Sequence, residues 1–410
     1  MEVVYEQCCG LDIHKKSIVA CLALPGPRGT AATTVRTFGT MTADILALSD
    51  WLTGAGCTHV AMESTGVYWK PIWNLLEGLF TLLLVNPRHM KAVPGRKTDV
   101  TDAEWIASLL RHGLLTGSYV PERAQRELRE LTRYRTTLVR ERTAEANRLQ
   151  KTLEGANIKL ASVATDILGL SGRQILAALV AGATDAEAMA QCAHGRLREK
   201  LPALTQALVG RFGDHQRFMV AQQLAHVDFL DATIATVSAE IGVRLQPVDD
   251  LVERLDAIPG IGRYVAEALI AEIGTDMSRF PTAGHLASWA GMCPGSHESA
   301  GKQHGGKTRK GNAWLRSQLV QAAHAAGRTK GTYLQAQYRR LAARRGKSRA
   351  AVAVGHTILV IIYHIVRDGT VYEDLGPHYF AERDRQGTER RLVHQLEGMG
   401  YTVTLEPCAA

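Results

Sequence analysis

The sequence predicts a mixed α/β domain at the amino terminus, a long helical linker and a mainly helical carboxy-terminal part. Over the first 120 residues, short apolar runs of strand length alternate with segments of helical periodicity. A charged helical pattern covers residues 122–154, Ala- and Leu-rich helices continue to residue 250, and glycine-rich stretches follow. These changes predict an α/β domain at 1–120, a helical or coiled-coil oligomerisation region at 121–250, a third domain at 251–330 and a helical extension at 331–410.

Composition narrows the class of protein. The hydrophobic content of 46% is ordinary for a globular protein, and the net charge of +8 with a pI near 9.1 favours a polyanionic partner. The seven cysteines are scattered, odd in number and contain no Cys-x-x-Cys pair. That pattern argues against a disulfide framework or a structural zinc site and fits a reducing cytoplasm. No signal-peptide pattern is present at the amino terminus.

The first 112 residues contain the expected elements of one sheet. Two strands within residues 8–24 are joined by a tight turn at 14–16, because apolar runs flank His14–Lys15–Lys16. Three antiparallel strands followed by alternating helices and strands predict a sheet of the ribonuclease-H type. The further elements expected, in order, are a strand at Thr34–Phe38, a helix at Thr42–Leu52, a strand at His59–Gly66, a helix at Tyr68–Leu76, a strand at Phe80–Val85 and a helix ending near His112.

Four carboxylates fall at strand ends or at the helix that packs beside them. They are Asp12, Glu63, Asp99 and Asp102. Asp99 and Asp102 are three residues apart, which places both on one side of a helix that Thr98 or Asp99 would cap. Carboxylates that converge at one sheet edge would hold magnesium or manganese for two-metal phosphoryl transfer. Singly, each acid also fits a turn or cap, and an acidic first turn also complements the helix dipole.

Two further regions carry many arginines. The helix at 122–154 has eight of them, which suit a nucleic-acid backbone, a helix partner or a solvated face. A basic run from Arg339 to Arg349 is expected to form another phosphate-facing edge, with a solvated face as the alternative. The apolar stretch Ala350–Val366 that follows is short for a membrane span and contains two histidines, so we expect a buried helix.

The stretch Ile258–Gly262 lies between helical segments and predicts a helix-hairpin-helix. Gly260 and Gly262 would let backbone N–H groups approach a phosphate at a helix amino terminus. An ordinary corner between helices is the alternative.

A glycine- and lysine-rich loop at residues 293–312 follows. Its cations Lys302, Lys307, Arg309 and Lys310, like Lys97 in an earlier basic loop, are expected to contact phosphates. A serine in this loop could be a phosphate-contacting hydroxyl or a nucleophile, and spacing alone does not decide between them. The frame of a Walker A loop is absent.

These motifs together resemble those of the DEDD-type insertion-sequence transposases of the IS110 family. The resemblance covers about residues 8–150 and 250–330. It rests on GLDIHK (10–15), MESTGVYW (62–69), KTDVTDA (97–103), IPGIG (258–262) and ESAGK (298–302). It implies a RuvC-like first domain whose metal-binding acids are Asp12, Glu63, Asp99 and Asp102. It also implies a second domain with a nucleophilic serine that becomes transiently linked to DNA; Ser299 is the first choice and Ser296 the reserve.

The same resemblance implies partners that residue patterns do not show. They are donor and target DNA, a guide (bridge) RNA that pairs with both, and further copies of the chain as a dimer assembling to a tetramer. In that assembly the acids of one subunit meet the serine of another. We therefore expect a Mg²⁺- or Mn²⁺-dependent DNA recombinase in the bacterial cytoplasm, associated with the nucleoid and not with a membrane. The rival readings are a junction-resolving nuclease that uses water as nucleophile and a non-catalytic nucleic-acid-binding protein.

Overall fold

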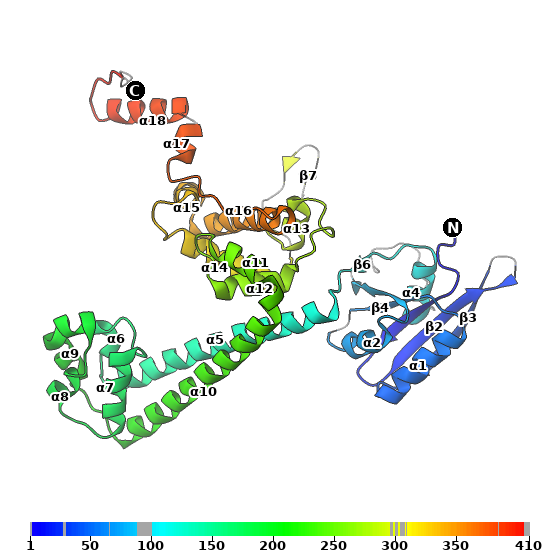
Figure 1. Ribbon diagram of the computed structural model, residues 1–410, viewed down its shortest axis with the longest axis horizontal. Helices are drawn as coiled ribbons and strands as arrows, with labels where there is room; N and C mark the ends of the chain where they lie inside the picture. The colour runs from blue at the N-terminus through cyan, green and yellow to red at the C-terminus, as the bar shows by residue number, and fades with distance from the viewer. Residues whose placement is uncertain are drawn as a thin grey trace. The chain divides into compact units, whose positions relative to one another are not determined.

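The computed structural model divides the chain into two compact units, Met1–Glu122 and Arg123–Ala410 (Figure 1). It describes residues 2–27, 30–64, 66–87, 101–295, 298–299, 302–303, 308, 310–383 and 385–405. The first unit is a mixed α/β domain, and the second is almost entirely helical. This coarse division confirms the fold class expected for the two parts of the chain.

The first unit is built on a six-stranded sheet of order β3-β2-β1-β4-β5-β6. Strands β1, β2 and β3 pair antiparallel, whereas β1, β4 and β5 run parallel to one another. The strands are β1 (Cys8–Ile13), β2 (Ile18–Pro25), β3 (Ala31–Phe38), β4 (His59–Glu63), β5 (Thr81–Val85) and β6 (Gly117–Ser118). The predicted strands are all present, although β3 begins three residues earlier than expected and β4 ends at Glu63. Strand β6 was not predicted, because two residues carry no alternating pattern.

Helices cover both faces of this sheet. Residues of α1 (Thr42–Gly54) and α2 (Trp69–Leu76) pack with Cys9, Leu11 and Ile13 of β1 in one core. On the other face, α4 (Asp102–Arg111) packs against Cys8 and its neighbours on β4 and β5. Because a central strand covered on both faces has no solvent side, β1 is apolar at nearly every position.

The beginning of α4 differs from the prediction. Thr101, not Thr98 or Asp99, is the residue that caps it: Thr101 has an extended backbone, and its side chain accepts a hydrogen bond from the Glu104 N–H. The Glu104 carboxylate in turn accepts from the Thr101 N–H at 3.0 Å, which completes a capping box. Asp102 is therefore the first helical residue. Asp99 lies outside the described residues, so the expectation that Asp99 and Asp102 share one helical face stays a prediction.

Two long helices dominate the first half of the second unit. Helix α5 (Arg123–Gly155) and helix α10 (Asp214–Leu245) lie side by side (Figure 1). At one end of this pair, short helices enclose a separate core that includes Leu149, Leu153 and Val220. These helices are α6 (Leu160–Val163), α7 (Leu170–Val180), α8 (Ala186–Ala190) and α9 (Leu201–Leu208), with a 3-10 helix at Gly195–Lys200.

A second helical core lies toward the carboxy terminus. Its buried residues come mainly from α11 to α14 and from α16. The elements are α11 (Asp249–Asp256), α12 (Arg263–Ile273), α13 (Ala283–Trp289), α14 (Ala313–Ala326), α15 (Tyr333–Arg345) and α16 (Lys347–Asp368). Helix α16 is long and apolar enough to cross a membrane by length and composition, but half of its most apolar window is buried inside the unit. The prediction of a buried helix at 350–366 is confirmed.

The chain continues into α17 (Tyr379–Arg383) and α18 (Arg385–Glu397). Phe380 stacks on Tyr333 of α15 with ring centroids 5.1 Å apart, and Tyr333 N–H donates to the Asp374 carboxylate at 2.9 Å. These contacts join α17 to α15.

Candidate active site

Two of the four predicted acids lie at adjacent positions in the sheet. Leu11 of β1 pairs with Met62 of β4 in parallel register, so Asp12 and Glu63 are the next residues on neighbouring strands. Strands in a sheet are about 4.8 Å apart, and residues in matching register point to the same face. Both carboxylates are half-buried.

Helix α4 brings the third acid to the same end of β1. Gly10 lies directly under α4: a Cβ on Gly10 would meet the Ala103 carbonyl oxygen and the Ala107 nitrogen, both at 2.4 Å. The Cys8 thiol donates to the Ala107 carbonyl at 3.8 Å, so α4 runs opposite to β1. Asp12, two residues beyond Gly10 on the same face, therefore lies toward the end of α4 that begins with Asp102. Only a residue without a side chain permits this approach at position 10.

A histidine that sequence reasoning passed over contacts this group. His14 Nε2 lies 3.2 Å from Asp12 Oδ2, and the His14 backbone N–H closes the turn by donating to the Ser17 carbonyl at 2.9 Å. The sequence indicates this contact only through the position of His14 in the predicted turn, two residues after Asp12.

Three carboxylates at one edge do not amount to a formed metal site in the described residues. Among them, no three His, Cys, Asp or Glu side chains are grouped closely enough to hold a metal ion. Glu104 follows Asp102 by two residues, but its carboxylate is engaged in the capping box with Thr101. These hydrogen bonds lower the pKa of Glu104. Asp99, the fourth predicted ligand, and Lys97 lie outside the described residues.

The serine loop contains a short β-hairpin. Strand β7 (Glu298–Ser299) pairs antiparallel with β8 (Lys302–Gln303), so Ser299 and Lys302 are backbone partners across the two strands. A further bridge joins Pro294 to Thr308. For Ser299 and Lys302 the structure describes the backbone alone. Ser296, Lys307 and Arg309 lie outside the described residues, and Lys310 is exposed.

Side chains from the helical core hold the base of this hairpin. The Arg316 Nη1 group donates to the Gly291 carbonyl at 3.2 Å and to Thr308 Oγ1 at 2.7 Å, so it ties together the two ends of the loop. Asn312 caps α14 by accepting from the Trp314 and Leu315 N–H groups. Its amide also donates to Glu272 Oε2 at 2.6 Å. Both ends of the loop are therefore held by side chains of the helical core.

The predicted helix-hairpin-helix corner joins α11 to α12. Gly260 has φ +91°, and a Cβ there would lie 2.3 Å from the Ala322 carbonyl oxygen of α14. Gly260 is therefore explained by close packing against a helix. Gly262 is the N-cap of α12 with φ −107°, and the nearest atom to a Cβ there is Asp256 Oδ1 at 3.9 Å. Of the two predicted glycines, Gly262 is the one with open space beside it.

Most arginines of α5 have partners within the second unit. Arg135, which is buried, lies 2.6 Å from Glu267 Oε2 and packs on the ring of Tyr264 at 3.7 Å. The other pairs are Arg123 with Glu127, Arg129 and Arg133 with Glu272, Arg142 with Asp231, and Arg148 with Glu145. The pairs of Arg123 and Arg148 lie within α5 itself. The other contacts reach α10 and α12 and support a helix partner among the three interpretations.

Two family models match separate stretches of the chain, and the first of them extends past Glu122 through α5. A DEDD-type IS110 family model described as transposase matches residues 9–158, and a model described as transposase IS116/IS110/IS902 family matches residues 252–339. The chain is 28% identical over 322 residues to a Pseudomonas aeruginosa protein named probable family 20 transposase, covering 76% of this chain and 85% of that protein. It is also 28% identical over 311 residues to an uncharacterized 43.6 kDa protein of insertion element IS110 from Streptomyces coelicolor, covering 69% of this chain and 74% of that protein.

Proposed function

Because the chain belongs to the IS110 family of insertion-sequence transposases, we propose that it cuts, exchanges and rejoins DNA strands through a transient bond between Ser299 and DNA. The observation that supports this most directly is the placement of Asp12 and Glu63 at adjacent positions on parallel strands, with α4 directing Asp102 to the same end. Like charges repel at such separations, so this arrangement favours a site that receives a cation.

Asp12, Glu63, Asp99 and Asp102 would hold a divalent cation of the Mg²⁺ or Mn²⁺ type. The donor set fits such an ion, since hard cations select carboxylate oxygens. When bound, the cation stabilises the charge that develops on a phosphate during phosphoryl transfer. The protein's own contribution is to fix the carboxylates: β1 and β4 set the spacing of two of them, and Gly10 lets α4 lie close enough to bring a third.

In the proposed reaction the Ser299 hydroxyl oxygen attacks the phosphorus of a DNA phosphodiester. A serine–phosphorus bond forms, one deoxyribose–phosphate bond breaks, and the leaving sugar oxygen takes up a proton in exchange for the one that the serine loses. Rejoining is the reverse attack by the hydroxyl of another strand. The cations Lys302, Lys307, Arg309 and Lys310 would hold the strand and stabilise the charge on the phosphate oxygens.

The finer features of the proposal rest on the sequence patterns and on the resemblance of the motifs. They are a ribonuclease-H-type, RuvC-like fold for the first unit, domain boundaries at 120, 250 and 330, and a helix-hairpin-helix at 258–262. They also include guidance by a bridge RNA and assembly to a tetramer in which the acids and the serine come from different subunits. The strand order β3-β2-β1-β4-β5-β6 supports the fold assignment. The net charge of +8 supports nucleic-acid partners.

The proposal is tested by trapping the covalent product on a denaturing gel. Protein, labelled donor and target DNA, RNA transcribed from the flanking element and Mg²⁺ are mixed. A protease-sensitive protein–DNA band is expected for the wild type and is expected to be lost in Ser299→Ala and Asp12→Asn. The matched controls are Ser278→Ala and Asp50→Asn, which change an exposed serine and an exposed carboxylate of the same units and should retain the band.

Other outcomes of this experiment would contradict the role of Ser299 or the proposed reaction. A band that persists in Ser299→Ala excludes Ser299 as the nucleophile and directs the search to Ser296. Cut DNA without any protein–DNA band would contradict the serine mechanism in favour of a nuclease that uses water. DNA binding with neither cleavage nor a band would contradict the enzymatic function.

A further inference from the structure

Positive charge is concentrated in one stretch of the chain. Residues 299–367 contain fourteen lysines and arginines and no aspartate or glutamate. The arginines of α5, by contrast, are mostly paired with carboxylates of the same unit. From α14 to α16 the sequence has a single carboxylate, Asp368 at the end of α16, and it pairs with Arg367. The other cations of these helices have no carboxylate in the same stretch, which favours an external anion.

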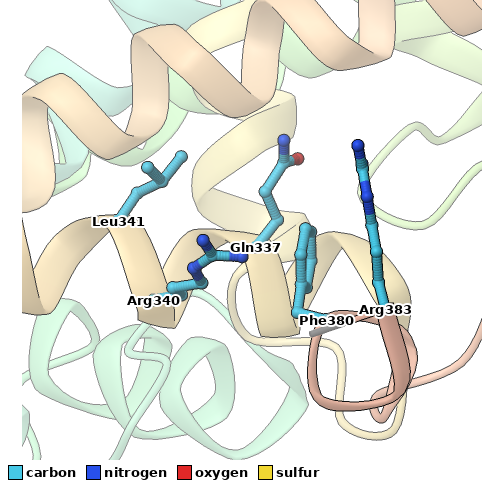
Figure 2. A pocket seen from close by; sticks show the side chains of 5 residues that line it. All are labelled: Gln337, Arg340, Leu341, Phe380 and Arg383. Carbon is cyan, nitrogen blue, oxygen red and sulfur yellow. The ribbon is translucent and has the colours of Figure 1, made fainter. Parts of the chain in front are cut away.

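A groove of about 1040 Å³ lies on this stretch, at the base of the serine hairpin. The hairpin contributes Pro294 and Thr308 to its wall, and α15 and α16 contribute most of the rest. A second hollow of about 550 Å³ shares Gln337 and Leu341 with the groove. In this hollow Gln337, Phe380 and Arg383 reach in the same direction from α15 and α17 (Figure 2).

The charges that line both hollows are all positive in the described residues. Arg345 and Arg349 are exposed at the groove, and neither is paired with a described carboxylate. Arg340 and Arg383 line the adjoining hollow, and both are likewise exposed and not paired with a described carboxylate. The Arg340 guanidinium carbon lies 5.0 Å from the centroid of the Phe380 ring. The amino terminus of the 22-residue helix α16 also lies at the groove, through Ser348 and Ala350, and its dipole adds partial positive charge.

The floor of the groove is apolar. Met292, Leu341, Val352 and Ala353 line the groove together with Arg316, Arg345 and Arg349. Duplex DNA presents phosphates outward and encloses its bases, so a duplex would satisfy the arginines but leave this floor in water. A single strand offers phosphates to the arginines and sugar and base surfaces to the floor at the same time.

We propose that this groove binds one unpaired strand of DNA by its sugar–phosphate backbone, with phosphates on Arg345 and Arg349. The proposal rests on the proposed function, because it would hold the strand on which the Ser299 loop acts. Arg316 supports this geometry, since it lines the groove and also ties the two ends of that loop.

The test measures binding without chemistry. Ser299→Ala protein in EDTA is titrated against fluorescent oligo(dT) of ten nucleotides, and anisotropy is followed from 0.05 to 0.3 M salt. The Arg345→Gln/Arg349→Gln variant is expected to bind roughly tenfold or more weakly at 0.1 M salt, and its log K against log salt slope should fall by about 1.4, since each single-strand phosphate contact contributes about 0.7. The control Arg123→Gln/Arg148→Gln removes the same charge from exposed, carboxylate-paired arginines of α5 and should match the parent.

Three binding results would overturn the proposal. They are equal loss in the control variant, a groove variant that binds oligo(dT) like the parent, and a loss confined to duplex DNA or to oligo(U) RNA. Because Arg345 and Arg349 are exposed, the variant should keep the parent's melting temperature, and a large drop would also count against it. Failure of covalent trapping, with this binding pattern intact, would refute the serine mechanism and leave the groove assignment standing.

Discussion

The Arg133 guanidinium holds the Glu272 carboxylate through two hydrogen bonds, from Nε to Oε1 at 2.6 Å and from Nη2 to Oε2 at 2.9 Å. The Glu272 side chain is only 2% exposed, and its Oε2 also accepts from the Asn312 amide. One buried carboxylate therefore connects α5, α12 and Asn312, the residue that caps α14 directly after the serine loop. Nothing in the local sequence around Glu272 indicates this role.

Glu272→Ala should destabilise the second unit by about 3–5 kcal/mol, because removing one partner of a buried ion pair leaves the other charge without compensation. Urea unfolding followed by tryptophan fluorescence measures this. The control is Glu240→Ala, whose carboxylate is 49% exposed and pairs with Arg244, and which should cost less than about 1 kcal/mol. Equal effects of the two substitutions would refute the assigned role of Glu272.

The two glycines of the α11–α12 corner should respond differently to alanine. Gly260→Ala should lower the melting temperature markedly, because its φ is +91° and its Cβ would overlap the backbone of α14. Gly262→Ala should leave stability within about 1 kcal/mol, since the space beside it is open. If the corner also binds phosphate, Gly262→Ala weakens DNA binding without unfolding the protein. A comparable loss of stability in both variants would contradict this packing.

The cap of α4 is tested by a pair of substitutions at one position. Thr101→Ala should cost about 1 kcal/mol, because it removes the side-chain acceptor for the Glu104 N–H and the hydroxyl donor to the Glu104 carboxylate. Thr101→Ser retains both and should stay near the parent value. Thermal unfolding of the amino-terminal unit provides the comparison, and an unchanged melting temperature in Thr101→Ala would show that the cap contributes nothing.

The thiols of the sheet should resist alkylation until the first unit opens. Burial raises the pKa of Cys8 to about 11 and that of Cys21 and of Cys57 to about 12, from an ordinary value of 9.0. The unfolded thiols ionise at lower pH than the folded ones, so their contribution to stability is complete below pH 9 and is lost as pH rises above it. Iodoacetamide at pH 8 followed by mass spectrometry should label Cys192, which is half-buried, before these three. Equal labelling rates would disprove the burial.

Much of the first unit could be predicted from local patterns. Strands and helices appear in the predicted order, because alternation, apolar runs and breakers act over a few residues. The positions of Asp12 and Glu63 at strand ends could likewise be predicted from the ends of the apolar runs. Errors occurred at element ends: the N-cap of α4 is decided by the Thr101–Glu104 pair, which competes with other capping candidates in the same stretch.

The amino-acid sequence by itself determined the order of elements, the strand-end acids, the buried α16 and the basic character of residues 299–367. Only the tertiary structure decided which charges are available. The arginines of α5 and of the α15–α16 corner look alike in sequence, yet most of the former are paired with carboxylates of the same unit, and Arg345 and Arg349 face a groove. Likewise Gly260 permits close packing against α14. Such roles depend on residues far apart in the chain, and their contact is set by packing rather than by any local pattern.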